Sequence, residues 1–475
     1  MEKGTNLRNH GLGLGLLVAV SLLLHLAYLF SPLARMNFLP MDEGIYWDLA
    51  GHLSRDGRLA LSGPAFATVG AGEQTLFWTP VYPILLSLAL KLSPLVKASP
   101  LLILQLIQIL LVACVPLLMY PIAGRFLKGK WLWLFLVFAS LYPYTFQLAT
   151  QVGSETTALF LSLAALSLAC ARARKSPLSL LLLGTLAAWL CLDRPEYLAF
   201  SLVLLAWVSF RLVRERGPEG GAALDSVSGG QGTARGLIVL CLSFSVWMGA
   251  WMYRNYQVTD GIAFTTRSGY SLAYQNEYYN LYSLGEVGSE EEWARAFPAF
   301  PTEMRRYAYL KGRARDFIRH HPLVYAQLCA KRLASFFLPQ EAKGWIYHVL
   351  KRRDFKAVGI PAWFRFSNEV FLAGLWFLVL PASLRFLFRC LKRRRLPRSF
   401  WESPAGLLLL LILGQMAVYT FFAYIEYQRS ILDLEILLLG FFFLAQDPLG
   451  SPVYPKPGPH SGPQNNPQKP QKNGE

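Results

Sequence analysis

The sequence predicts an all-α polytopic membrane protein, and three features lead to that fold class. Of its 475 residues, 54% are hydrophobic and only 16% are charged, whereas a soluble protein usually carries about 25% charged residues. Apolar runs long enough to cross a bilayer recur along the chain. The net charge of +17 fits Lys and Arg that mark one side of a membrane. No basic face on a soluble fold accompanies this charge, so no nucleic-acid partner is expected.

Ten apolar runs have a length suited to membrane spans, although several lie at the short end of the allowed range. The first run follows Lys3 and Arg8 and is not cleanly followed by a small-residue cleavage site, so we expect an uncleaved span rather than a signal peptide. The ten predicted spans cover residues 11–30, 99–122, 131–148, 154–171, 177–193, 196–213, 236–253, 365–388, 404–422 and 429–446.

One further apolar segment, residues 79–92, is short for a span, and the distribution of basic residues decides how to treat it. If it does not cross and the N-terminus is cytoplasmic, the basic loops near residues 125–130, 172–175, 211–216 and 385–398 all lie inside. If it crossed, the same loops would lie outside. We therefore expect a juxtamembrane or re-entrant helix on the outer face and both termini in the cytoplasm.

This topology divides the chain into five segments. Residues 217–232 and the C-terminal tail are rich in Gly, Ser, Pro or Asn and cannot bury enough apolar surface to order themselves. The five segments are the first span with the first outer loop (1–98), spans two to seven with a disordered cytoplasmic linker at 217–232 (99–253), a large outer loop (254–363), the last three spans (364–446) and a disordered cytoplasmic tail (447–475).

Amphipathic helices are predicted in the large outer loop. Glu303–His320 and Leu323–Leu338 place apolar residues at helical spacing, with Arg and Lys between them. Such helices can lie in the headgroup layer or pack on the bundle, and the sequence leaves both placements open.

Ionisable residues gather at the outer ends of the predicted spans. Asp42 and Glu43 follow the first span at the start of a predicted helix, where an acid can also serve as a helix cap. Charged groups beside apolar spans are costly, so they tend to pair or to line a functional cavity. The others are Tyr46 and Asp48 in the first outer loop, Glu155 before the fourth span, Arg194 after the fifth, Arg254 and Asn255 after the seventh, Lys331 and Arg332 in the large loop, and Arg429 before the last span.

In the order and sidedness of these motifs, residues 10–445 resemble the GT-C fold glycosyltransferases. The resemblance is greatest to the bacterial relatives of dolichyl-phosphate-mannose–protein mannosyltransferase and of lipid A aminoarabinose transferase. The pair Asp42-Glu43 and the stretch from Trp251 to Tyr256 carry it. The family usually has Pro before this Trp, where the chain has Ala250, and Arg-Tyr in the last outer connection, where the chain has Gln-Arg429.

The resemblance implies that a sugar moves from a polyprenyl-phosphate carrier to a glycan, lipid or protein acceptor at the outer face of a bacterial inner membrane. In such chemistry a carboxylate can take the proton of the acceptor hydroxyl, and Asp42 is expected as this base, with Glu43 orienting the substrates. Fixed arginines would stabilise the leaving phosphate. The predicted substrate-binding residues are Tyr46, Glu155, Arg194, Arg254, Asn255, Lys331, Arg332 and Arg429.

Cofactor use is only partly constrained by the sequence. Asp42, Glu43, Asp48 and Glu155 could supply oxygen ligands to a divalent cation, so metal dependence stays open. A nucleotide cofactor is not expected, because Gly11-Leu-Gly-Leu-Gly15 lies in a span and lacks the strand–turn–helix context of a phosphate-binding loop.

Transport of lipid-linked glycans and polysaccharide polymerisation or ligation are alternatives to sugar transfer. A flippase or other transporter of lipid-linked glycans should show polar residues deep within its spans and inverted repeats, and the sequence shows neither. A membrane-embedded polysaccharide polymerase or ligase is expected to lack the acidic pair directly after the first span.

Overall fold

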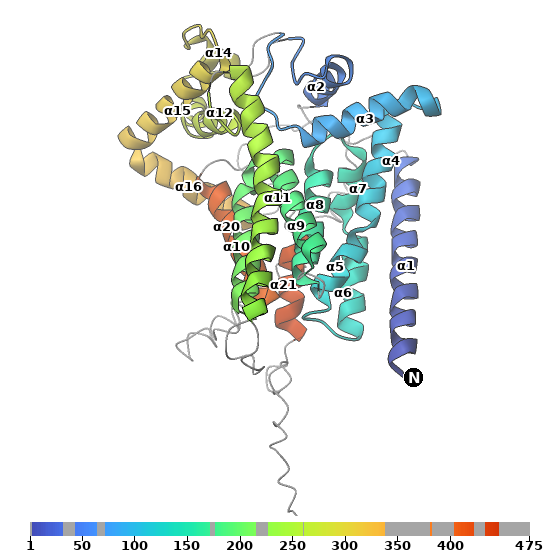
Figure 1. The fold of residues 1–475 in the computed structure, drawn as a ribbon. Coiled ribbons are helices and arrows are strands. Elements are labelled where there is room, and N and C mark those ends of the chain that lie inside the picture. Colours follow the sequence, from blue (N-terminus) through green and yellow to red (C-terminus); the bar gives the residue numbers. More distant parts are fainter. Residues whose placement is uncertain are drawn as a thin grey trace, which may run out of the picture.

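The computed structural model describes residues 2–31, 43–63, 72–171, 176–214, 227–259, 261–337, 381, 403–421 and 433–445. Within these ranges the regular structure is helical, apart from one isolated bridge between Ala60 and Gln74. Long helices run side by side as a bundle, and shorter helices cover one end of it (Figure 1). The predicted all-α polytopic class is confirmed.

Six helical segments of the described chain are long and apolar enough to cross a membrane: 10–29, 100–123, 130–150, 195–214, 233–259 and 404–421. They are formed by α1 (Glu2–Leu29), α4 (Pro100–Ala113) with α5 (Val115–Ala123), α6 (Lys130–Ser140) with α7 (Pro143–Thr150), the 3₁₀ helix η4 (Pro195–Tyr197) with α10 (Leu198–Arg214), α11 (Val227–Thr259) and α20 (Pro404–Phe421). Two shorter apolar helices, α8 (Glu155–Cys170) and α9 (Pro177–Asp193), match two further predicted spans. Nearly every side chain of α8 is buried, so α8 forms the centre of the bundle.

Two of the predicted spans are described incompletely. The last one, residues 429–446, is represented by α21 (Asp433–Ala445). The span predicted at 365–388 lies outside the described residues, apart from Pro381. The predicted tail, 447–475, also lies outside them. α11 begins at Val227, so the end of the predicted disordered linker is helical. A helix already formed by the span can be extended at little cost, because only nucleation is unfavourable.

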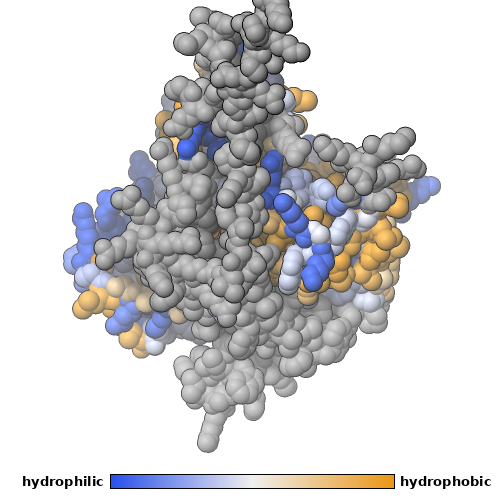
Figure 2. All heavy atoms as spheres, turned by 90° about the horizontal axis from the view of Figure 1, so that it is seen from below, coloured by the Kyte–Doolittle hydropathy of each residue, from blue (hydrophilic) through white to orange (hydrophobic). Residues whose placement is uncertain are grey.

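The flanks of the bundle expose apolar side chains. Figure 2 views the molecule from the end at which α1 begins and shows apolar side chains gathered on its flanks. Leu23 of α1, Leu110 of α4 and Leu242 of α11 are each more than half exposed. Exposure of large aliphatic side chains on long helices is the pattern expected where lipid rather than water surrounds the protein.

The shorter helices at one end of the bundle form what we call the cap layer. It consists of α2 (Glu43–Asp56), α3 (Val81–Val96), α12 (Arg267–Ala273), α13 (Tyr279–Leu284), α14 (Glu290–Arg295) and α15 (Glu303–His320). A π-helical turn, Tyr274–Tyr278, joins α12 to α13, and α16 (Pro322–Phe337) leads from α15 back toward α20. α15 has the predicted bounds. Of its residues at helical spacing, Leu310, Ala314 and Phe317 are buried and Tyr307 is half-buried.

The placement of α3 bears on the predicted topology. α3 lies across the end of the bundle rather than along it (Figure 1), which agrees with the expectation that residues 79–92 do not cross. Arg125 donates to the carbonyl oxygen of Cys170, and this contact lies at the end of the bundle opposite the cap layer. The basic loop at 125–130 therefore lies at that opposite end, whereas residues 172–175 lie outside the described residues. The assignment of that end to the cytoplasm stays a prediction.

The contact between α9 and α11 depends on Gly184. A Cβ atom on this residue would lie 2.6 Å from the carbonyl oxygen of Leu240 and closer still to the hydroxyl of Ser243. Small residues let membrane helices approach each other closely. Since α9 ends beside Arg194 and Arg254 lies five residues before the end of α11 at Thr259, this close contact also fixes the spacing of residues at the cap end.

Replacing Gly184 with alanine should destabilise the bundle by about 1–3 kcal/mol, because the backbone of α11 must shift to make room. Thermal unfolding of the purified protein in detergent measures this as a lower Tm. Gly249→Ala is the matched control, since Gly249 lies on α11 with no atom within 4 Å of its would-be Cβ. Equal Tm values for the two variants would contradict the prediction.

Candidate active site

Arg194 is the centre of a buried charged cluster at the cap end of the bundle. Its side chain is almost fully buried, and its Nη1 donates to Oε1 of Glu155 at 2.6 Å. Its Nε donates to Oε1 of Glu196 at 2.8 Å, and Nη1 also lies 3.3 Å from the hydroxyl of Ser154. Burial opposes the charge on this guanidinium, but Glu196 and Glu155 outweigh it and hold the pKa of Arg194 well above its ordinary value. Arg194 is therefore a fixed cation in a dry environment.

The local sequence explains why these groups meet. Pro195 disfavours a helical conformation at the preceding residue, and Arg194 has extended backbone angles of φ −141° and ψ 109° where α9 ends. Its side chain reaches α8, whose first turn carries Glu155. An acid is favourable at that position, because the helix dipole is positive at its N-terminus. Because Pro195 ends α9 at this point, the end of α9 and the start of α8 contribute to one cluster.

Asp193 ties the same cluster to the loop before α3. Its carboxylate lies 2.8 Å from the hydroxyl of Thr157 on α8. Its main-chain oxygen accepts a hydrogen bond from the hydroxyl of Thr79 at 3.0 Å. Asp193 is only 4% exposed and interacts with Arg194. Three carboxyl groups, those of Asp193, Glu155 and Glu196, therefore surround this arginine.

The acidic first loop reaches this cluster through α2. The hydroxyl of Tyr46 lies 3.5 Å from that of Ser154, and its ring packs edge-on against Tyr82. Glu43 precedes Tyr46 by three residues and so lies on the same face of α2. One oxygen of the Glu43 carboxylate is buried and has no hydrogen-bond partner among the described residues. A buried acceptor left without a donor is rare in proteins, so this oxygen is a suitable contact for a substrate group. Asp42 itself lies outside the described residues.

The other predicted substrate-binding residues make different contacts. Arg254 donates to the carbonyl oxygen of Thr75 at 3.0 Å and to Oε1 of Gln74 at 3.2 Å, and its guanidinium lies over the Trp251 ring. Asn255 donates to the carbonyl oxygen of Ala263 at 2.9 Å. These residues hold the end of α11 against two segments of the cap layer, and no described contact joins them to Arg194.

Lys331 and Arg332 are neighbours in sequence but point to different places. Arg332 donates to the carbonyl oxygen of Thr420 at 3.3 Å and to Oδ1 of Asn276 at 2.8 Å, which links α16 to α20 and to the π-helical turn. Burial lowers the pKa of Arg332. Lys331 is exposed and lines a groove on the cap layer. Arg429 lies outside the described residues.

Sequence reasoning missed several members of the buried cluster. Asp193 and Glu196, which flank Arg194 and Pro195, are not among the residues that the sequence predicts for the site. Tyr197 follows them, and its hydroxyl is buried with no hydrogen-bond partner among the described residues. Tyr197 interacts electrostatically with Glu435 of α21, which is only 1% exposed. An acid inside an apolar run is a functional candidate, and this signal could have identified Glu435.

Two of the four candidate metal ligands are engaged by other side chains, and a third, Asp42, lies outside the described residues. Glu155 is engaged by Arg194, and both carboxylate oxygens of Asp48 accept hydrogen bonds from Ser62. Within the described ranges, no three His, Cys, Asp or Glu side chains are grouped so that they could hold a metal ion. We therefore assign no step of the reaction to a metal.

Glu303 holds two segments of the cap layer together. Its carboxylate accepts hydrogen bonds from the main-chain nitrogen of Leu76, at 3.2 Å, and from the hydroxyls of Thr75 and Thr266. Glu303 is 3% exposed. Burial raises its pKa, although these hydrogen bonds act in the opposite direction.

The raised pKa of Glu303 predicts a pH dependence of stability. The folded chain holds this proton more tightly than the unfolded chain, so stability should fall as the pH rises from about 4.5, the ordinary value, through the folded pKa. Glu303→Gln should flatten this part of the profile, and the exposed Glu286→Gln should not. Tm measured between about pH 4.5 and pH 8 tests this. A profile with the same slope in Glu303→Gln as in the unaltered protein would rule it out.

No protein-family model matches the chain, and no curated protein is similar to it in sequence. Its fold is similar to that of the oligosaccharyltransferase of Archaeoglobus fulgidus. The apo crystal structure gives a TM-score of 0.47 at 14% identity, covering 90% of this chain and 50% of that one. The crystal structure with Zn and sulfate gives 0.46 at 10% identity, covering 90% and 48%.

A third structure, of the A. fulgidus oligosaccharyltransferase AglB with an inhibitory peptide and a dolichol-phosphate, gives a TM-score of 0.40 at 11% identity. It covers 90% of this chain and 50% of that one. The chain thus spans about half the length of the structures it matches. With TM-scores below 0.5, the functional assignment rests on the residues of the site.

Proposed function

We propose that this protein is an integral membrane glycosyltransferase that moves a hexosyl or pentosyl group from a polyprenyl-phosphate carrier to an acceptor hydroxyl at the outer face. The observation that carries the proposal is the buried Arg194 cluster at the cap end, with Glu43 on the adjoining face of α2. It combines a fixed cation with an acidic residue at the end of a membrane bundle. A lipid-linked phosphate leaving group and an acceptor hydroxyl need these two kinds of group.

The proposed reaction is a single displacement. The acceptor oxygen attacks the anomeric carbon, and the bond from that carbon to the phosphate oxygen breaks, so the electron pair leaves with the polyprenyl phosphate. The hydroxyl proton passes to a carboxylate, for which Asp42 is our candidate, and Glu43 orients the substrates. One displacement inverts the anomeric centre, as in one-step glycoside hydrolysis.

Arg194 contributes through both its charge and its rigidity. Nη1 and Nε are engaged by Glu155 and Glu196, which fix the guanidinium plane. Nη2 makes no hydrogen bond within the described part of the chain and is the proposed donor to a phosphate oxygen. Because the site is dry and preorganised, such a donor is effective where negative charge develops. Arg429, outside the described residues, is the second cation proposed for this phosphate.

A transporter of lipid-linked glycans is the second candidate, because polar residues do lie inside the bundle. Glu435 is buried in α21, and both polar atoms of the Gln415 side chain in α20 are buried without a hydrogen-bond partner among the described residues. Buried polar groups within spans are typical of substrate pathways. Polymerase or ligase activity toward a surface polysaccharide remains a variant of the same transfer chemistry.

The test is donor consumption by the purified full-length protein. It is incubated in detergent with a panel of polyprenyl-phosphate sugars that includes glucosyl, mannosyl and arabinosyl forms, and release of polyprenyl phosphate is measured. We expect one donor to be consumed. The proposal fails if no donor is consumed while the protein moves lipid-linked sugars across liposome membranes.

A further inference from the structure

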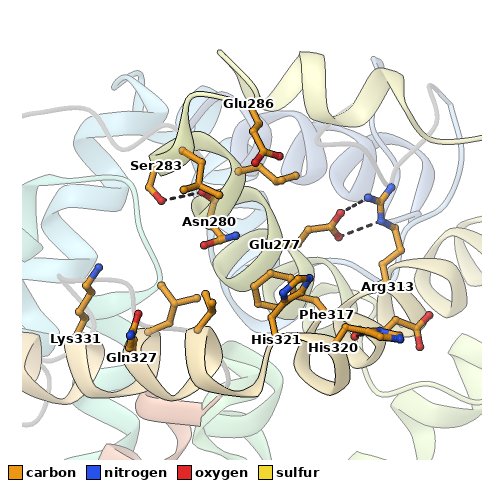
Figure 3. Close-up of a pocket in the computed structure, with 15 residues that line it drawn as sticks. Glu277, Asn280, Ser283, Glu286, Arg313, Phe317, His320, His321, Gln327 and Lys331 are labelled. Carbon is orange, nitrogen blue, oxygen red and sulfur yellow. Dashed lines mark hydrogen bonds and ion pairs between the residues drawn. The ribbon is translucent and has the colours of Figure 1, made fainter.

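A groove with a volume of about 800 Å³ opens on the cap layer, between α13 and the corner where α15 meets α16. This volume lies within the range of roughly 300–1,000 Å³ that is usual for ligand sites. Figure 3 shows side chains from both walls converging on it. The groove is distinct from the Arg194 cluster, since the lining residues include none of that cluster's members.

The groove presents uncommitted polar side chains. The amides of Asn280 and Gln327 line it from opposite walls, and Lys331, Glu286 and Asp316 add charged groups. None of these five side chains has a hydrogen-bond partner within the described ranges. Two further lining residues, Glu277 and Arg313, pair with each other. Nε of Arg313 donates to Oε2 of Glu277 at 3.0 Å. The groove therefore offers both donors and acceptors to a ligand.

Charge decides against an anionic ligand. Three carboxylates line the groove, together with the two cations Arg313 and Lys331 and the imidazoles of His320 and His321. A phosphate or an anionic lipid headgroup would meet Glu286 and Asp316, and like charges at close range are repelled. Lys331, which the sequence predicts as a substrate-binding residue, lies in this groove among these carboxylates.

A polyhydroxylated ligand fits the remaining chemistry. A sugar hydroxyl both donates and accepts hydrogen bonds, so it can use the amides and the carboxylates together. The exposed ring of His321, 5.2 Å between centroids from the ring of Phe317, offers a flat face to a pyranose. An extended peptide fits less well, because it usually pairs its main chain with a sheet edge, and the walls here are helices whose main-chain groups are already used.

We propose that this groove binds the sugar residues of a neutral or amino-bearing glycan, which serves as the acceptor. The acceptor role rests on the proposed function, whereas glycan binding itself does not. The proposal selects a glycan from the glycan, lipid and protein acceptors that the sequence left open. It also separates donor binding at the Arg194 cluster from acceptor binding at the groove.

The test is glycan binding by calorimetry, with full-length protein in a detergent that has no sugar headgroup. The probes are mannotetraose and chitosan tetrasaccharide, compared with tetragalacturonate, glycerol 1-phosphate and a ten-residue Ser- and Thr-rich peptide. We expect a neutral or amino-bearing tetrasaccharide to bind. Asn280→Ala/Gln327→Ala should weaken binding about tenfold through the loss of two hydrogen bonds.

Gln257→Ala is the matched control, because it removes an exposed side-chain amide of α11 outside the groove. Unaltered affinity in the double variant, or a failure of both tetrasaccharides to bind, would overturn the proposal. So would preferential binding of tetragalacturonate, glycerol 1-phosphate or the peptide. Donor consumption is measured in parallel without acceptor. Donor consumption without glycan binding defeats only this inference, and glycan binding without donor consumption defeats only the proposed function.

Discussion

Replacing Asp42 with asparagine is expected to lower sugar transfer by about 10²-fold or more, because a positioned general base contributes about 10²–10⁴-fold to such a step. Asparagine has nearly the same size and can still act as a helix cap, so expression and Tm should not change. Transfer is measured with the donor that the panel identifies and its acceptor, at saturating donor. The loss should appear in kcat rather than in KM, since the base acts in the transition state.

Two further variants make this result specific. Glu43→Gln should lower transfer less than Asp42→Asn, because Glu43 is assigned an orienting role. Asp56→Asn is the control, since Asp56 is an exposed acid at the other end of α2 that contacts only His52 among its described polar contacts. Full transfer by purified Asp42→Asn would remove Asp42 as the base. A larger loss in Glu43→Gln than in Asp42→Asn would exchange their two roles.

The helices could be predicted from the sequence because their signals are local. The bounds of α15 follow from apolar spacing and from Thr302, whose hydroxyl accepts a hydrogen bond from the main-chain nitrogen of Arg305. The placement of α3 follows from its length and from the sidedness of basic loops. The first signal is local to α15, whereas the second is a pattern of charge along the whole chain that depends on no particular side-chain contact.

The site could be predicted only in part, because the direction of a side chain depends on partners that are distant in sequence. Arg194 and Glu155 were expected near each other, since both lie at outer helix ends. Arg254 lies near the end of α11 and Arg332 lies within α16, and they bind main-chain oxygens of Thr75 and Thr420. These contacts join segments 179 and 88 residues apart, and no local pattern encodes them.

Arg194→Met is expected to be the most destabilising single change at the site. It removes the guanidinium that pairs with Glu155 and Glu196, although Glu196 also interacts with Arg267. Removing one partner of a buried ion pair typically costs about 3–5 kcal/mol. The Tm of the purified variant, or its yield if it does not accumulate, measures this loss. A Tm near that of the unaltered protein would show that water reaches the cluster and that Arg194 is not in a dry site.

A compensated variant separates the structural role of Arg194 from its proposed catalytic one. Arg194→Met/Glu155→Gln/Glu196→Gln removes the stranded charges together with the arginine, so most of the lost Tm should return, because a buried ion pair is often replaceable by uncharged groups without loss of stability. Transfer should not return, since the triple variant lacks the Arg194 guanidinium that is proposed to stabilise the leaving phosphate. Recovery of both stability and transfer would mean that Arg194 serves only to neutralise its neighbours, and the phosphate contact would then have to be sought elsewhere.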